Sequence, residues 1–200
     1  GRSLFAPQQP AKSLNLPVEE APYQPLEKDS TRWVCVDDFG ADGFDRQDDT
    51  AAIKKAIDYA AKNHKTVLSF AAQGKYIAGG ELVISGSINR LQGARSYLVP
   101  PRRGSLRIVV KDGPSELVTF SLLDRPLGRH DITIENASAR TLVINHFRTK
   151  FTGSGPGKTF VEDACSNITV TNPEHRVWVR QLNSEGGDGP NNHNNGGTLW

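Results

Sequence analysis

Two residues near the end of the chain combine an aromatic ring with a fixed positive charge. In the run Val177-Trp178-Val179-Arg180-Gln181, valines alternate with larger or polar residues. Successive side chains of a β-strand point to opposite faces, so inward valines would place Trp178 and Arg180 together on the outer face. An indole can stack on a sugar, and a guanidinium can bind a carboxylate through two parallel hydrogen bonds. This predicts a contact with an acidic glycan. The alternative is that another segment, such as the proline-rich N-terminal region, covers Trp178 while Arg180 pairs with a neighbouring acid.

A cluster of aspartates lies between residues 37 and 49. Carboxylate oxygens at short spacing suit Ca²⁺, although this spacing does not follow the register of an EF-hand loop. Aspartates also accept hydrogen bonds from backbone N–H groups in turns and at helix starts. The two interpretations are a Ca²⁺ site and this structural role, and the family resemblance described below implies the structural role. The cluster consists of Asp37, Asp38, Asp42, Asp45, Asp48 and Asp49.

Other patterns that could carry chemistry are weaker. The five histidines have no spacing typical of metal ligands, so no metal-ligand set is assigned. Residues 153–159 resemble a phosphate-binding loop, but the glycine spacing is one residue short and no long helix follows, so a turn is expected. Cys35 and Cys165 lie far apart, and the sequence favours two buried thiols over a disulfide.

Composition narrows the class of protein. The chain has 200 residues, a formal net charge of +2, 19 glycines and 12 prolines, which indicates one domain with many turns. Basic residues form no run and no stripe interleaved with aromatics, so nucleic acid is not an expected partner. No stretch approaches the roughly 20 apolar residues of a membrane span.

The elements that position these residues are mostly short strands. Residues 1–32 are rich in proline and predict an extended arm or linker, and residues 33–200 form the remaining domain. One helix is expected at residues 50–62, where apolar residues recur at helical spacing: Ala52, Ile53, Ala56, Ile57 and Ala60. Strands are expected at 33–36, 66–70, 76–77, 82–84, 88–91, 106–110, 117–120, 132–134, 141–144, 159–161, 168–170 and 177–179.

Many short strands would usually indicate an antiparallel sandwich. Two features favour a coil instead. The strands are shorter than usual, and similar phrases recur at residues 131–136 and 167–172, each with an asparagine at the bend. Imperfect repetition of one unit is typical of a solenoid, in which each turn buries its apolar face against the next.

The opening motif resembles that of the pectate-lyase/polygalacturonase superfamily. The resemblance lies in residues 36–43, in Asp48-Asp49-Thr50-Ala51-Ala52-Ile53, and in the later strand and turn up to Tyr76, where Ala72 replaces the usual proline. It implies an all-β fold, a right-handed parallel β-helix, with helix 50–62 capping its N-terminal mouth. Residues 177–185 and 195–200 are similar to uncharacterised bacterial β-helix proteins of this superfamily, in which the coil continues, so we expect a longer natural chain.

The resemblance also implies candidate site residues on the late coils. No Gly-His-Gly is present, and Arg107 and Lys111 have the wrong spacing for the polygalacturonase Arg-x-Lys. Pectate lyases use a cation, usually Ca²⁺, and an Arg or Lys base, so Ca²⁺ is the one cofactor that the resemblance suggests. The predicted catalytic residues are Arg180, Asp163 and Glu185, and the predicted substrate-binding residues are Trp178, Asn183, His146 and Lys150. Simple polar alternation on the outer face is the competing explanation.

Two classes of function follow from this reading. The first is an extracellular polysaccharide-processing protein, a lyase or hydrolase that acts on an acidic glycan. The second is a non-catalytic β-helix that serves as a glycan-binding adhesin, a surface-structure component or a tailspike-like assembly module. Both imply a secreted or cell-surface protein with a polysaccharide as partner, and self-assembly through the arm or the coil ends is a further expectation.

Overall fold

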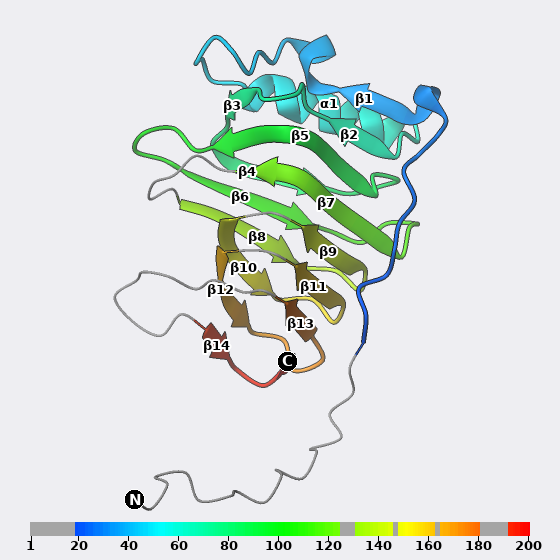
Figure 1. Ribbon diagram of the computed structural model, residues 1–200, viewed down its shortest axis with the longest axis vertical. Coiled ribbons are helices and arrows are strands. Elements are labelled where there is room, and N and C mark those ends of the chain that lie inside the picture. Colours follow the sequence, from blue (N-terminus) through cyan, green and yellow to red (C-terminus); the bar gives the residue numbers. More distant parts are fainter. Residues whose placement is uncertain (1–18, 125–130, 146–147, 163–164, 181–191) are drawn as a thin grey trace, which may run out of the picture.

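A computed structural model describes residues 19–124, 131–145, 148–162, 165–180 and 192–200 (Figure 1). Its strands form two sheets in which every neighbouring pair is parallel. The nine-stranded sheet has the order β1 (Trp33–Cys35), β2 (Val67–Ser69), β5 (Arg90–Val99), β7 (Leu117–Asp124), β9 (Thr141–Asn145), β11 (Lys158–Glu162), β13 (Arg176–Arg180) and β15 (Thr198–Leu199), with β3 (Lys75–Ile77) also paired to β5.

The six-stranded sheet takes the strands that lie between these in sequence. Its order is β14 (Asn192–Asn194), β12 (Cys165–Val170), β10 (Arg148–Gly153), β8 (Asp131–Asn136), β6 (Ser105–Val110) and β4 (Gly80–Ile84). From β4 onward the chain therefore alternates between the two sheets and stacks each turn on the previous one. This is the right-handed parallel β-helix that the sequence predicts, and the parallel pairing excludes an antiparallel sandwich.

The core is built from inward side chains that stack from coil to coil. Because the strands pair in register, one apolar ladder passes through the nine-stranded sheet at successive inward positions. Its members are Leu68, Leu91, Phe120, Ile144, Val161 and Val179. The alternate positions of the same strands therefore face outward, and they form the surface considered below.

Helix α1 (Thr50–Lys62) covers the first coils at the N-terminal end of the β-helix (Figure 1). Its buried residues are the predicted stripe of Ala52, Ile53, Ala56, Ile57 and Ala60. The carboxylate of Asp48 accepts a hydrogen bond from the Thr50 N–H at 2.9 Å, at the first turn of the helix. The predicted capping helix and its bounds are confirmed.

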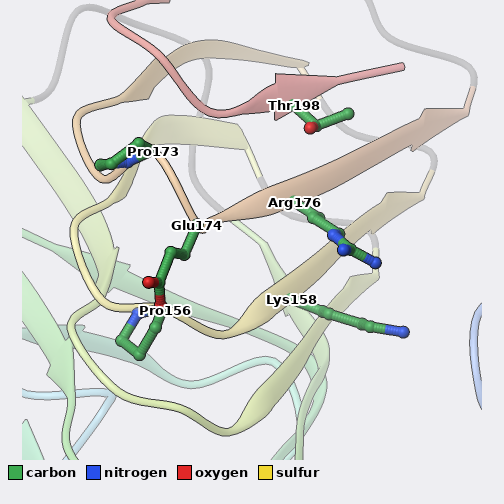
Figure 2. A pocket seen from close by; sticks show the side chains of 6 residues that line it. All are labelled: Pro156, Lys158, Pro173, Glu174, Arg176 and Thr198. Carbon is green, nitrogen blue, oxygen red and sulfur yellow. The ribbon is translucent and has the colours of Figure 1, made fainter.

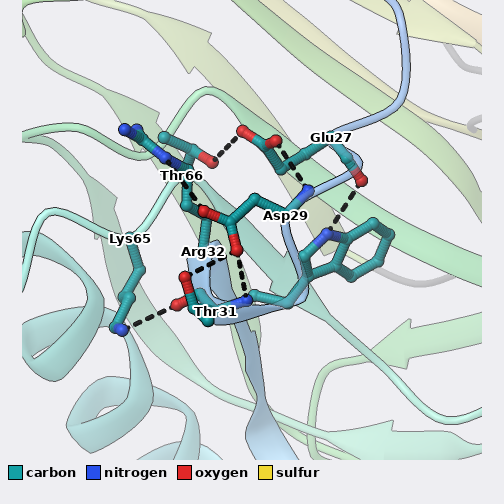
Figure 3. Close-up of polar contacts among 7 residues, drawn as sticks. Glu27, Asp29, Thr31, Arg32, Lys65 and Thr66 are labelled. Carbon is teal, nitrogen blue, oxygen red and sulfur yellow. Dashed lines mark hydrogen bonds and ion pairs between the residues drawn. The ribbon is translucent and has the colours of Figure 1, made fainter.

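The segment from residue 19 to residue 32, which we call the arm, lies against the outside of the nine-stranded sheet (Figure 1). It ends in the short 3-10 helix η1 (Ser30–Arg32), and a second one, η2 (Val36–Phe39), follows β1. Figure 3 shows how its end is fixed: the Trp33 indole donates to the Glu27 carbonyl at 3.1 Å, and the Lys65 ammonium donates to the Thr31 carbonyl at 2.7 Å. The arm is thus held by side chains of the first coil.

Candidate functional site

An outer ladder of side chains crosses the nine-stranded sheet. In register, Arg90 of β5 lies beside Thr119 of β7, followed by Val143 of β9, Phe160 of β11 and Trp178 of β13. The ladder changes character along its length, because it is polar at β5 and β7 and apolar from β9 onward. The arm crosses both parts.

The apolar part of the ladder forms a second, small cluster outside the main core. Trp178 stacks on Phe160 with ring centroids 4.9 Å apart and an interplanar angle of 12°. Ala21 of the arm and Trp200 pack against this cluster, and Trp178 is only 7% exposed. Trp178 therefore faces outward, as the alternation predicts, but it is covered and does not form an open platform.

Cations surround this cluster, and the arm supplies acids to two of them. The Lys158 ammonium lies 2.7 Å from a Glu19 carboxylate oxygen and 5.6 Å from the centre of the Trp178 ring. Arg180 donates a hydrogen bond to Glu20, and this contact raises the pKa of Arg180. The structure thus has the second of the two arrangements considered from sequence, in which the arm covers Trp178 and Arg180 pairs with an acid.

A pocket of about 490 Å³ lies beside this cluster, at the start of strands β11, β13 and β15. Lys158 and Arg176 occupy adjacent register positions and project side by side from it (Figure 2). Within the described residues, the exposed guanidinium of Arg176 has no hydrogen-bond or ion-pair partner. The remaining lining residues are Pro156, Pro173, Glu174 and Thr198. The pocket therefore presents a cation that is available to an anionic ligand.

At the polar end of the ladder, Arg90 is only 6% exposed. Its guanidinium donates to the backbone carbonyls of Gln24 and Pro25 in the arm, at 2.6 and 3.5 Å, and to Gln92 Oε1 and Ser121 Oγ, at 3.3 and 3.4 Å. No carboxylate of the described residues lies within ion-pair distance. Removal from water lowers the pKa of Arg90, because burial disfavours the charged form. The buried Oγ1 of Thr119 and Oε1 of Gln24 have no hydrogen-bond partner among the described residues.

A buried polar network lies behind the pocket, where the chain enters β13. His175 is fully buried, and its Nδ1 donates to the Gly155 carbonyl at 2.8 Å. Its Nε2 lies 3.1 Å from the Thr159 hydroxyl, which also accepts a hydrogen bond from the Asn136 amide at 3.3 Å. The carbonyl can only accept, so Nδ1 carries a proton. Burial lowers the pKa of His175 and so favours the neutral ring, in which Nε2 accepts from the Thr159 hydroxyl. Gly153 makes room for the ring, since a Cβ there would lie 2.3 Å from the His175 Cδ2.

The aspartate cluster is used to build the opening loop. The Asp49 carboxylate accepts from the backbone N–H groups of Asp42 at 2.8 Å and Ile77 at 2.9 Å, and Asp37 accepts from the Tyr76 hydroxyl at 2.6 Å. Burial raises the pKa of Asp49. No three His, Cys, Asp or Glu side chains in the described part of the chain are placed to hold one metal ion. These hydrogen bonds give the carboxylates of Asp37 and Asp49 a structural role in the loop.

The predicted site residues fall in different places. Lys150 is exposed on β10, in the six-stranded sheet, so it does not share a face with Trp178 and Arg180 on β13. His146, Asp163, Asn183 and Glu185 lie outside the described residues. Cys35 is a free, half-buried thiol, more exposed than the sequence suggested.

Sequence reasoning missed Lys158, Arg176 and Arg90. A signal for the first two was present, because Lys158-Thr159-Phe160 and Arg176-Val177-Trp178 share the pattern of cation, inward residue and aromatic residue. Aligning the two phrases as neighbouring coils would have placed the cations side by side.

Comparison with protein families agrees with this architecture. Residues 33–98 match the family model described as rhamnogalacturonase A/epimerase, pectate lyase-like. The matched part of the chain is pectate lyase-like. It comprises β1, α1 and the strands up to most of β5, which is the stretch whose motifs carry the resemblance. Comparisons with curated proteins and with solved structures find no match. In the part of the chain that the structure describes, no helix has the length and apolar character of a membrane span.

Proposed function

We propose that the chain binds an acidic polysaccharide at the pocket beside β11, β13 and β15. The observation that carries this proposal is the guanidinium of Arg176, which has no partner among the described residues and lies beside the ammonium of Lys158. The two cations are one strand spacing apart, about 4.8 Å, so both can reach the carboxylate of one acidic sugar. A guanidinium binds a carboxylate through two hydrogen bonds, and the neighbouring proline rings offer apolar contact to a sugar ring.

The pectate lyase-like match supports a processing role, in which the bound polymer is cleaved by a lyase or a hydrolase. Elimination from a uronate needs a cation against its carboxylate and a base for the α-proton, and the pocket offers two basic side chains. Non-catalytic binding is the second candidate. It is supported by the single carboxylate, Glu174, among the described residues that line the pocket, whereas glycosidases of the usual type employ a pair. In both cases we propose that the protein works outside the cell or at its surface.

The binding proposal is tested by titrating the chain with polygalacturonate and with a neutral dextran. Arg176→Gln should weaken polygalacturonate binding by about tenfold, the scale of a charge-assisted hydrogen bond. Arg103→Gln is the matched control, because Arg103 is an exposed arginine in the turn between β5 and β6. Equal affinities for the two variants, or equal binding of both polymers, would contradict the proposal.

Cleavage of polygalacturonate is tested with two measurements. Absorbance from unsaturated product ends reports a lyase, and new reducing ends without that absorbance report a hydrolase. Binding without either signal would favour the non-catalytic candidate for that polymer. Locating the protein in the culture medium or on the cell surface of its source tests the proposed location.

A further inference from the structure

The arm crosses the strands of the nine-stranded sheet from β13 to β2, as an extended ligand would. From Glu20, which contacts Arg180 of β13, to Glu27, which contacts Thr66 just before β2, the chain advances by seven residues. A fully extended chain covers about 24 Å in that distance. The five strand spacings from β13 to β2 also total about 24 Å. The arm is therefore stretched straight across the strands.

The contacts of the arm are those that an acidic glycan would make. Two adjacent carboxylates, Glu19 and Glu20, pair with Lys158 and Arg180, and Ala21 covers the Phe160–Trp178 stack. Carboxylates that meet cations and a small group over an aromatic surface reproduce the chemistry of uronate sugars on such a face.

At Gln24, where it crosses the polar part of the ladder, the arm is a poor partner for the surface it covers. It meets the buried guanidinium of Arg90 with two neutral backbone carbonyls, and the other acceptors, Gln92 and Ser121, are neutral too, although a buried cation is stabilised best by an opposite charge. It also leaves Thr119 Oγ1 and Gln24 Oε1 buried without partners in the described part of the chain. An unsatisfied buried polar atom is costly, so this patch is better suited to a ligand that carries a carboxylate and hydroxyl groups.

We infer that the arm occupies a binding surface for an acidic glycan and that the glycan displaces it. The glycan would then lie along the outer ladder without interruption from the Arg176 pocket to Arg90. This inference rests on the proposed binding of an acidic polysaccharide. The arm and the glycan compete for the same cations, so the apparent affinity for glycan is reduced by the fraction of molecules whose arm is seated. The seated arm therefore raises the glycan concentration that is needed for binding.

The test uses the whole chain and weakens the contacts of the arm by removing charges only. The double variant Glu19→Gln/Glu20→Gln removes both carboxylates that hold the start of the arm. The control, Asp38→Asn/Asp58→Asn, removes the same two charges at exposed positions of η2 and α1. Because exposed ion pairs contribute modestly, the arm variant should bind polygalacturonate about three- to tenfold more tightly than the parent, while the control should bind like the parent.

A second measurement follows the arm itself. Hydrogen exchange at residues 19–27 should accelerate when polygalacturonate is added, and trypsin should then cleave sooner after the exposed Lys28. If the parent and the arm variant bind equally and the arm stays protected, the displacement is refuted while the binding proposal stands. If neither binds polygalacturonate, the binding proposal fails and this inference fails with it. Exchange of arms between two copies, seen as a stable dimer of the parent by light scattering, would also overturn it.

Discussion

The buried histidine that precedes β13 makes the stability of the late coils depend on pH. His175 is held neutral, with Nδ1 donating to a carbonyl and Nε2 accepting from Thr159. Burial lowers its pKa in the folded state below the ordinary value of 6.5, so the unfolded chain binds the proton more readily. The stabilisation is therefore fully present above pH 6.5 and is lost as the pH falls below it.

The size of this effect follows from linkage. A group that stays neutral when folded and has an unfolded pKa of 6.5 lowers the free energy of unfolding by at most about 1.4 kcal/mol between about pH 7.5 and about pH 5.5. His175→Gln should remove this contribution, so its free energy of unfolding should fall less over the same interval. His193→Gln, which changes an exposed histidine on β14, should keep the pH dependence of the parent.

The assay is urea unfolding of the three proteins at both pH values, followed by tryptophan fluorescence. The quantity compared is the change in the free energy of unfolding with pH, so a constant loss of stability in either variant cancels. Identical pH dependence in the parent and in His175→Gln would show that the imidazole does not titrate as a buried neutral group, and the reasoning would be wrong.

Three further substitutions test the packing that positions the site, each by the urea midpoint. Gly153→Ala should cost about 1–3 kcal/mol, because its Cβ would meet the ring of His175, and a smaller loss in a His175→Ala background would confirm the cause. Arg140→Met should cost about 2 kcal/mol, because this buried guanidinium donates to backbone carbonyls of two preceding coils; an unchanged midpoint would argue against that role. Tyr76→Phe should cost about 1.5–3 kcal/mol, because the buried hydroxyl donates to Asp37, and a loss no larger than that of an exposed Tyr59→Phe would refute it.

Local sequence was sufficient for the helix and for most strands. Helix 50–62 has a strong period of apolar residues and an aspartate at its start, and both features act within a few residues of each other. The strands that carry β-branched residues between turn residues were predicted to within a few residues. The opening motif then identified a parallel β-helix. The strand patterns alone would not have distinguished this fold from an antiparallel sandwich.

The sequence did not predict β10 and β14, and β5 is much longer than predicted, for reasons that lie outside the local sequence. β10 has little apolar character and is a strand because it pairs with β8 and β12 on either side. β14 is a polar run that pairs with the edge of β12. β5 continues to Val99 through an irregularity in which Arg95 has a φ of 58°, so the Gly-Ala-Arg stretch resembled a loop.

Trp178 is covered through contacts between residues far apart in the sequence, which no local pattern predicts. The ion pair between Glu19 and Lys158 joins residues 139 positions apart, and proline-rich sequence does not indicate the surface on which it lies. The sequence therefore predicted the direction of Trp178 and left open what covers it. The cations of the pocket became visible only when the coils were stacked in register.

A crystal structure of the chain with a short oligogalacturonate tests the proposed glycan site most directly. We expect acidic sugars on the outer face of the nine-stranded sheet, with one carboxylate bound by Arg176 and Lys158 in the pocket beside β13. Sugars bound on the six-stranded sheet, or a fully soaked crystal with no sugar at Arg176, would contradict it.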